Sequence, residues 1–443
     1  MTTERDLTRR EFVAAATAIG AGGLVAAPAL GRTTGSGRAD PIRVGIIGCG
    51  GRGSGALIQA LKADPGSVLW AMGDLYPERI EPCLGYARSA MEEQDEEQGT
   101  SRYAQKIQAE PERRFSGFDA YAKVIDSGVD MVILTTPPVF RPQHLAAAVN
   151  AGKHVFCEKP VAVDAPGVRS VLESARIAKE KGVSLMSGFC WRYQLQMREA
   201  FDKLQGGGVG DIRTIQSTYN ATGWVQPKER KPAWSETEFQ TRNWHYFHPI
   251  SGDHIVEQAV HAIDWIGWAL GDKSPQRCWA VGGRQTREDL PQTGNVYDHF
   301  SVTYEFAGGV RAYHMCRHWP NSPYDNSGYV TGSDGVMTID AWNGNHVIEG
   351  ANPWKGTAPA NDMYQQEHDE LFASIRSGKP INDGVAMSSS TMMAIMGRMA
   401  AYTGQAVTWE QAMNSQENLN PGPWAFGDRA TPPVALPGTT RLI

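Results

Sequence analysis

The sequence IRVGIIGCGGRGSGALIQALK, residues 42–62, decides the fold of the first part of the chain. It opens with a strand-like apolar run, Ile42–Ile47, passes through the turn Gly48-Cys49-Gly50-Gly51-Arg52-Gly53 and ends in an apolar helix. The first glycine of such a turn permits the sharp bend, the second lets a pyrophosphate approach the backbone, and the third lets helix and strand pack closely. We therefore expect a dinucleotide whose phosphates lie at the N-terminus of this helix.

The next strand, residues 68–73, ends at Asp74. A carboxylate at this position accepts hydrogen bonds from the adenosine ribose, which favours NAD because the 2′-phosphate of NADP would meet negative charge. Arg52 and Arg79 are nearby cations that keep NADP possible. Strands expected at 130–135 and 153–157 alternate with a helix at 143–152. This alternation predicts a doubly wound parallel sheet with ligands beyond the C-terminal ends of its strands.

Polar residues follow these two later strands. Thr136-Pro137 ends the first of them, His144 lies in the helix that follows, and Glu158-Lys159-Pro160 ends the second. In a parallel sheet all of these positions lie at the same edge as the glycine-rich turn. We therefore expect them to share one crevice with the cofactor.

Farther along, the stretch 251–270 (SGDHIVEQAVHAIDWIGWAL) is apolar enough for one buried helix. On a helix, Glu257, His261 and Asp264 would form a single stripe because they are spaced i, i+4 and i+7. Two acids and an imidazole are costly to bury without partners. The stripe is therefore either a satisfied polar seam between helices or part of a site.

Taken in order, the glycine-rich turn, the Thr-Pro-Pro with its following His, AGKHVFCEKP at 151–160 and the ExxxH pattern at 257–261 resemble the Gfo/Idh/MocA family. The family is named for glucose–fructose oxidoreductase, inositol dehydrogenase and a rhizopine-catabolism protein. The resemblance covers residues 42 to about 412. It implies a Rossmann domain followed by a domain with a large, open and mostly antiparallel sheet, whose strands we expect at 212–219, 300–306 and 310–317.

The resemblance also assigns residue roles. It implies that Lys159 contacts both the nicotinamide ribose and the substrate, and that His261 does acid–base chemistry beside Glu257, where the family usually has Asp. The implied cofactor-binding residues are Gly48, Gly50, Gly51, Arg52, Gly53, Asp74, Thr136, Pro137, His144, Glu158 and Lys159. The candidate substrate residues are Arg192, Tyr193, Trp244, His245 and Asp264. Arg192 has the alternative role of a structural ion-pair partner, and the aromatic residues of the long loop at 221–250 that of packing the loop onto the body.

Composition excludes several classes of function. The net charge of −6 gives no reason to expect nucleic acid as a partner, and no membrane-length apolar run follows the N-terminus. The six cysteines have neither metal spacing nor a disulfide pattern. His245, His248, His254 and Glu257 also lack a diagnostic ligand spacing, so we predict no metal.

The N-terminus resembles a twin-arginine signal. Arg9-Arg10 precede an uncharged Ala- and Gly-rich stretch, and Ala27-Pro28-Ala29 offers a cleavage site. This predicts export to the periplasm by the twin-arginine machinery. The expected organisation is a signal peptide at 1–29, a linker at 30–40, a Rossmann domain at 41–162, a substrate and oligomerisation domain at 163–412, whose last helices pack back on the first domain, and an extended tail at 413–443.

The function expected from these features is hydride transfer between a sugar or polyol carbon and tightly bound NAD, or alternatively NADP, in a homodimer or homotetramer. Two alternatives remain. One is an NAD-dependent glycosidase that oxidises its sugar transiently, although relatives of that kind often lack the Glu-Lys-Pro motif. The other is a non-catalytic sugar-binding protein that only holds NAD.

Overall fold

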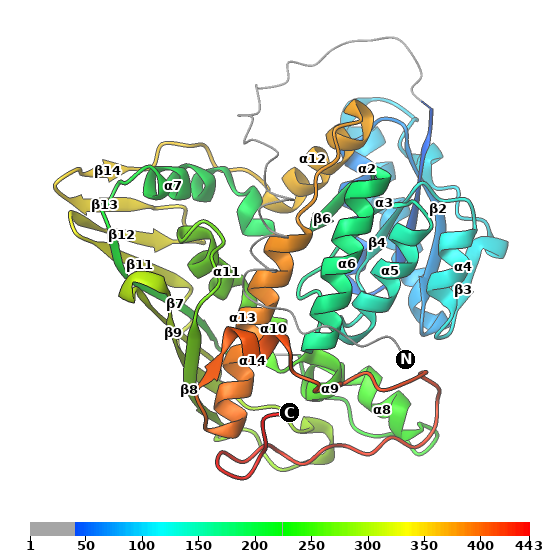
Figure 1. Ribbon diagram of the computed structural model, residues 1–443. Coiled ribbons are helices and arrows are strands. Elements are labelled where there is room, and N and C mark those ends of the chain that lie inside the picture. Colours follow the sequence, from blue (N-terminus) through cyan, green and yellow to red (C-terminus); the bar gives the residue numbers. More distant parts are fainter. Residues whose placement is uncertain (1–39, 224) are drawn as a thin grey trace.

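A computed structural model describes residues 40–223 and 225–443 of the chain. The expected twin-arginine signal and nearly all of the linker lie outside the described residues. Two sheets stand apart, with helix α13 (Gly384–Thr403) running between them (Figure 1). Within the described part, no helix combines the length and the apolar character that crossing a membrane requires.

The first sheet has six strands, all parallel, in the order β3-β2-β1-β4-β5-β6. The order reverses between β1 and β4, which is where ligands bind in open parallel sheets. This confirms the predicted doubly wound fold. The strands are β1 (Ile42–Ile47), β2 (Ser67–Asp74), β3 (Arg114–Ser116), β4 (Met131–Leu134), β5 (His154–Cys157) and β6 (Leu185–Ser187). The helices beside them are α2 (Gly51–Ala63), α3 (Ile80–Gln98), α4 (Ala120–Asp126), α5 (Arg141–Asn150) and α6 (Ala165–Lys181).

The first sheet continues beyond the domain boundary that we placed after residue 162. After α6 the chain returns as β6, which pairs in parallel with β5. Asp164 caps the N-terminus of α6 through the backbone N–H of Gly167, and Gly182 ends the helix in the left-handed conformation. The chain therefore leaves the first sheet after Ser187.

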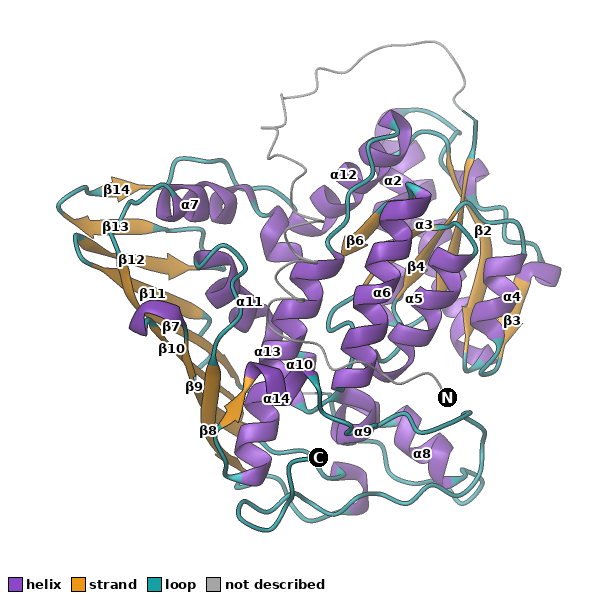
Figure 2. Ribbon diagram, in the orientation of Figure 1, coloured by secondary structure: helices purple, strands orange, loops and turns teal. Residues whose placement is uncertain are grey.

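The second sheet has nine strands in the order β14-β13-β12-β11-β7-β10-β9-β8-β15. All neighbours are antiparallel except β7 and β10, so the expected mostly antiparallel sheet is confirmed. Figure 2 shows helices over one face of this sheet. The strands are β7 (Ile212–Ala221), β8 (Arg277–Gly283), β9 (His299–Glu305), β10 (Arg311–His318), β11 (Ser327–Gly332), β12 (Gly335–Asp340), β13 (Val347–Gly350), β14 (Trp354–Lys355) and β15 (Val407–Thr408).

Helices complete the contact between the two sheets. Nearly every residue of α13 is buried, and the helix touches both α6 of the first domain and β8 of the second. Helix α12 (Met363–Ser377) packs on α2, and α14 (Trp409–Met413) packs on α13. Helix α7 (Leu195–Gln205) packs on α11 (Val260–Ala269), which contacts β7. The two domains therefore form one body with a shared apolar core.

The buried helix expected over most of residues 251–270 is interrupted, and only its second half is a continuous helix. The stretch divides into the end of α9 (His248–Ser251), α10 (His254–Glu257) and α11. Gly252 and Asp253 both have positive φ, at 80° and 72°. The buried Asp253 carboxylate accepts the N–H groups of His254 and Tyr297 and the hydroxyl of Tyr402, which offsets the cost of this conformation.

A cover extends from the second domain toward the first. We use this name for residues 225–247, which include α8 (Glu236–Arg242), together with the tail segment 419–431. The two parts are joined by hydrogen bonds from Thr237 N–H to the Gly427 carbonyl and from the Gln240 amide to the Arg429 carbonyl. In Figure 1 the tail, coloured red, runs beneath both domains to reach α8.

Candidate active site

One cavity of about 560 Å³ runs along the C-terminal edge of the first sheet. Asp74 lies at the end of β2 and Lys159 follows β5, and both line the cavity. Three strand spacings separate β2 from β5, which is about 14 Å. The cavity is therefore long enough to hold a dinucleotide laid across the switch point.

The glycine-rich turn fits a pyrophosphate. Gly48 has φ of 104°, and a Cβ at Gly53 would lie 2.0 Å from the Gly48 carbonyl oxygen, so neither position accepts a side chain. Gly51 has open space where a Cβ would be, and no side chain within residues 40–223 and 225–443 caps the N-terminus of α2. The turn thus leaves backbone N–H groups and room for phosphate oxygens.

Asp74 is held in place beside this turn. Its buried carboxylate accepts the backbone N–H of Cys49 at 2.7 Å and that of Tyr76 at 2.9 Å. Burial raises the pKa of Asp74 above its usual value, and these hydrogen bonds oppose the rise. A carboxylate has about four acceptor sites, so two donors leave capacity for ribose hydroxyls.

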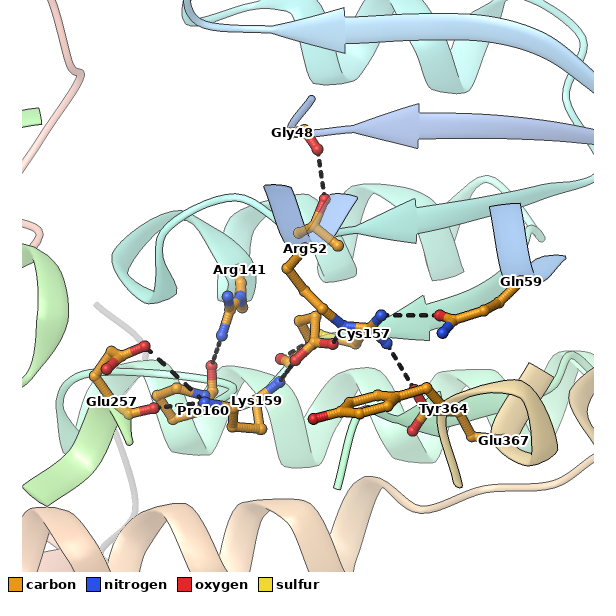
Figure 3. Close-up of polar contacts among 12 residues, drawn as sticks. Gly48, Arg52, Gln59, Arg141, Cys157, Lys159, Pro160, Glu257, Tyr364 and Glu367 are labelled. Carbon is orange, nitrogen blue, oxygen red and sulfur yellow. Dashed lines mark hydrogen bonds and ion pairs between the residues drawn. The ribbon is translucent and has the colours of Figure 1, made fainter. Parts of the chain in front are cut away.

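Arg52 lines the cavity, but its guanidinium is directed at protein groups. It donates to Glu158. It also donates to Glu367 at 2.7 Å and to Gln59 at 2.9 Å (Figure 3). Burial would raise the pKa of Glu158, but the charges of Arg52, Lys159 and Arg141 outweigh it and lower that pKa. The structure therefore gives Arg52 the role of fixing Glu158, and leaves Arg79, whose guanidinium lies over the Tyr76 ring, as the cation available to an NADP phosphate.

Thr136, Pro137 and His144 also line the cavity, as expected. The Thr136 hydroxyl lies 3.2 Å from Nδ1 of His144, whose ring stacks on Tyr121 with 4.2 Å between centroids. Burial lowers the pKa of His144 to about 3, with a smaller contribution from Arg141. The imidazole is therefore neutral and acts as a wall of the cavity rather than as a charge.

Lys159 reaches from the first domain to the second. Its ammonium donates to the backbone carbonyl of Glu257 at 2.7 Å and lies 4.0 Å from a carboxylate oxygen of the same residue (Figure 3). The Lys159 backbone N–H donates to Glu158, which Arg52 holds in turn. A Cβ at Gly188 would lie 2.8 Å from the Glu158 carboxyl group, so this support requires glycine there.

His261 enters the same cavity from the first turn of α11. Its Nδ1 is buried and has no hydrogen-bond partner among the residues that the structure describes. Burial lowers the pKa of His261 well below its usual value, and the positive charges of Lys159 and Arg52 add to the effect. The imidazole is thus neutral, and a neutral imidazole can accept a proton.

Models of known families match both domains. Residues 42–189 match the model described as the oxidoreductase family with an NAD-binding Rossmann fold, and residues 197–338 match the C-terminal domain of GFO/IDH/MocA proteins. The chain belongs to the Gfo/Idh/MocA family. Its first domain is accordingly the NAD-binding one.

Curated relatives of this Gfo/Idh/MocA protein match over a shorter range. They include 2,7-anhydro-N-acetylneuraminate hydratase of Escherichia coli, 27% identical over 48% of this chain and 52% of the relative. Trans-1,2-dihydrobenzene-1,2-diol dehydrogenase of mouse is 26% identical over 51% of this chain and 59% of the relative. The chain thus spans about half the length of the curated relatives it matches.

Solved structures confirm the fold over most of the chain. The aldose-aldose oxidoreductase of Caulobacter crescentus aligns with a TM-score of 0.62 and 20% identity, covering 83% of this chain and 99% of that one. A levoglucosan dehydrogenase, solved with NADH and levoglucosan, aligns with a TM-score of 0.63 and 18% identity over the same shares.

Of the five candidate substrate residues, Trp244 and His245 line the cavity. Their rings stack with 3.7 Å between centroids, and burial lowers the pKa of His245 to about 4. Arg192, Tyr193 and Asp264 do not line it. Their side chains are instead satisfied within the protein.

The structural alternative therefore holds for Arg192. Its guanidinium makes a two-pronged ion pair with Asp264 and a second one with Asp272. The Tyr193 hydroxyl donates to Asp383. Because the chain breaks between α10 and α11, Asp264 faces this buried cluster while Glu257 faces Lys159.

The break also changes the expected partner of Glu257. Within the described chain the Glu257 carboxylate makes no hydrogen bond to His261, and its Oε2 is buried without a partner. The ring of His261 lies instead against Phe189 and Trp191, at centroid distances of 6.0 and 6.1 Å. The structure thus places Glu257 with Lys159 and places His261 among aromatic rings.

Sequence reasoning missed several residues of the cavity wall. The clearest are Tyr219 at the end of β7, Gln258 between α10 and α11, and Tyr364 on α12. Gln258 stands next to Glu257 in the sequence, and that adjacency was a usable signal. Tyr219 and Tyr364 come from distant elements that only the tertiary fold brings to the crevice.

Proposed function

We propose that this protein is an NAD(P)-dependent oxidoreductase that acts on a hydroxyl-bearing carbon of a sugar or polyol. One observation carries the proposal: an ammonium from the first domain and a neutral imidazole from the second line the cavity that also holds the dinucleotide turn. Bound NAD supplies the acceptor for two electrons and one hydrogen at the nicotinamide ring.

The protein's own residues divide the remaining work. His261 accepts the proton of the substrate hydroxyl during oxidation and returns it during reduction. Lys159 stabilises negative charge on the same oxygen, and the Glu257 backbone carbonyl holds its ammonium in place. Trp244 offers an apolar face of the kind on which sugar rings stack.

The direct test supplies purified protein with NAD or NADP and a panel of aldoses and cyclic polyols. Absorbance of the reduced nicotinamide should rise with at least one substrate. The proposal would be refuted if no compound of the panel reduced either cofactor and the matching ketones or lactones gave no reverse reaction.

A relative named as a hydratase favours one second candidate, a glycosidase that oxidises its sugar only transiently. The intact Glu158-Lys159-Pro160 favours simple oxidation and reduction. Incubation with aryl glycosides separates the two functions, because release of phenol without net formation of NADH would indicate the glycosidase.

We also propose that the cofactor stays bound between turnovers. The cover is what supports this: Trp424 and Phe426 of the tail lie against Phe118 of the first domain, at centroid distances of 6.3 and 5.0 Å. Tyr76, two residues after the end of β2 at Asp74, bonds to Thr241 of α8 at 2.6 Å and lies beneath the guanidinium of Arg242.

The double variant Trp424→Ala/Phe426→Ala should release NADH about ten times faster than the unaltered protein. Each aromatic contact contributes about 0.5–1.5 kcal/mol, so the loss of two accounts for a factor of this size. The rate can be followed by fluorescence after dilution of the NADH complex. Leu436→Ala, an exposed change elsewhere in the tail, is the matched control, and equal release rates in all three proteins would contradict retention by the cover.

Self-association through the second sheet is a further part of the proposal. Trp279, Val281, Tyr313, Met315 and Tyr329 are exposed, and strand register places them together on one face. These large apolar side chains alternate with Ser301, Thr303 and Gln216, and an exposed sheet face with several large apolar side chains is typical of an interaction site. A homodimer or homotetramer would bury it.

The variant Tyr313→Glu should shift the protein to the monomer mass in light scattering, because a charge in an apolar interface is costly to desolvate. Arg213→Glu, an exposed change on the neighbouring strand β7, serves as the control. An unchanged mass in the Tyr313 variant would place the interface elsewhere.

Export by the twin-arginine pathway remains a proposal that rests on Arg9-Arg10 and the following apolar stretch. Twin-arginine export carries folded proteins, which suits an enzyme that acquires NAD before it leaves the cytoplasm. Replacing both arginines with lysine should trap the full-length protein in the cytoplasm, and unchanged periplasmic recovery would rule this route out.

A further inference from the structure

Gln258 lies at the reactive end of the cavity, and the mechanism above does not use it. The residue links α10 to α11, between Glu257 and His261, and its half-buried side chain lines the cavity wall. Its carbonyl oxygen Oε1 pairs with Nε2 of His318, the last residue of β10. Gln258 Nε2 makes no hydrogen bond with any residue in the described ranges.

His318 determines which way this amide points. His318 is buried, and burial, aided by the charges of Arg287 and His245, lowers its pKa well below the usual value. A neutral imidazole carries one N–H, and an amide oxygen can only accept. The Nε2–H of His318 therefore donates to Oε1 of Gln258. The amide nitrogen of Gln258, which carries two N–H donors, consequently lies on the side of the amide group away from His318.

The other charged groups of the cavity leave this end suited to an uncharged ligand. Lys159 is already close to the Glu257 carboxylate at 4.0 Å, and Arg141 donates to the Pro160 carbonyl at 2.5 Å. Arg79 and Arg242 lie over the ring of Tyr76, at the Asp74 end. Among the described residues, the guanidinium groups that line the cavity are thus engaged with protein groups, which suits this end to an uncharged substrate.

We propose that Gln258, held by His318, is a specificity-determining residue that donates a hydrogen bond to a hydroxyl next to the reacting carbon of an uncharged sugar or cyclic polyol. This rests on the proposed function for the identity of the reacting carbon. A site with such a donor discriminates against an analogue that lacks the hydroxyl, because the amide is then left unpaired.

The test measures binding and turnover in parallel. The NADH-loaded protein is titrated with D-glucose, D-xylose and myo-inositol, and then with each monodeoxy analogue of the tightest binder. The unaltered protein should bind one deoxy analogue about 10- to 100-fold more weakly than the parent. Gln258→Leu should weaken the parent by the same factor and abolish the discrimination at that one position, with NADH affinity unchanged.

Two further variants of His318 distinguish a role in orienting the Gln258 amide from a role in packing alone. His318→Leu removes the group that orients the amide and should reproduce the loss of discrimination, whereas His318→Asn keeps a donor and should restore part of it. Gln105→Leu, at an exposed site far from the cavity, is the control. In turnover the Gln258 change should raise KM and leave kcat within a few-fold.

The outcomes distinguish this inference from the proposed function. Binding that depends on Gln258, without reduction of NAD, would support the inference and refute the oxidoreductase. Equal discrimination in the Gln258→Leu variant and the unaltered protein, or failure of all three parent compounds to bind, would overturn the inference.

Discussion

Replacing Lys159 with alanine is expected to lower kcat for polyol oxidation about 10²- to 10⁴-fold. The ammonium is held 2.7 Å from the Glu257 carbonyl and is mostly shielded from solvent. In that setting a positive charge stabilises a developing alkoxide far more than it would in water. Stopped-flow measurement of NADH formation reports the chemical step.

The adjoining strand supplies a matched control for this change. Lys153 stands just before β5 and donates to the Val129 carbonyl, away from the cavity. Lys153→Ala should keep kcat within about threefold, and both variants should retain NAD, because the glycine-rich turn and Asp74 are untouched. Turnover of the Lys159 variant within tenfold of the unaltered protein would remove that residue from the chemistry.

Replacing His261 with alanine or asparagine is expected to reduce kcat by two or more orders of magnitude. General-base catalysis accelerates a reaction by a factor of about 10²–10⁴, and either replacement removes it. Alanine removes both ring nitrogens, and asparagine keeps polarity but cannot accept the proton usefully. The control is His299→Ala, because His299 pairs with Asp298 outside the cavity. A His261→Asn protein with near-normal kcat would reassign the base.

The same histidine gives a prediction about pH. Its pKa is lowered well below the usual value, so the base form is present at neutral pH and is lost only when the pH falls far below 6.5. The acid limb of kcat/KM for oxidation should therefore lie well below pH 6.5. An acid limb centred at 6.5 and absent from the His261 variants would show that the imidazole is not desolvated in the working enzyme.

The first sheet was predictable from sequence because its signals are local. The turn after β1 and the polar residues after β4 and β5 are fixed by chain position, and the parallel order brings them to one edge. Asp74 and Lys159 were placed in one crevice on this basis and His261 by the family resemblance, and all three line the cavity.

The substrate side was less predictable because it depends on where a helix breaks. The apolar content of residues 251–270 suited one helix, but the buried bonds of Asp253 hold a left-handed turn, and a second break follows at Gln258. Asp264 consequently forms an ion pair with Arg192, which is the structural role that we considered as the alternative for that arginine. No local sequence pattern reveals which side chains from distant elements will complete the wall of the cavity.

The contact between the tail and Phe118 bears on the order in which this chain matures. Residues 419–431 are synthesised long after Phe118, yet they close over the nucleotide end of the first domain. The nucleotide crevice of a nascent chain therefore stays uncovered until this tail segment has been made. Loading before that moment needs no opening step.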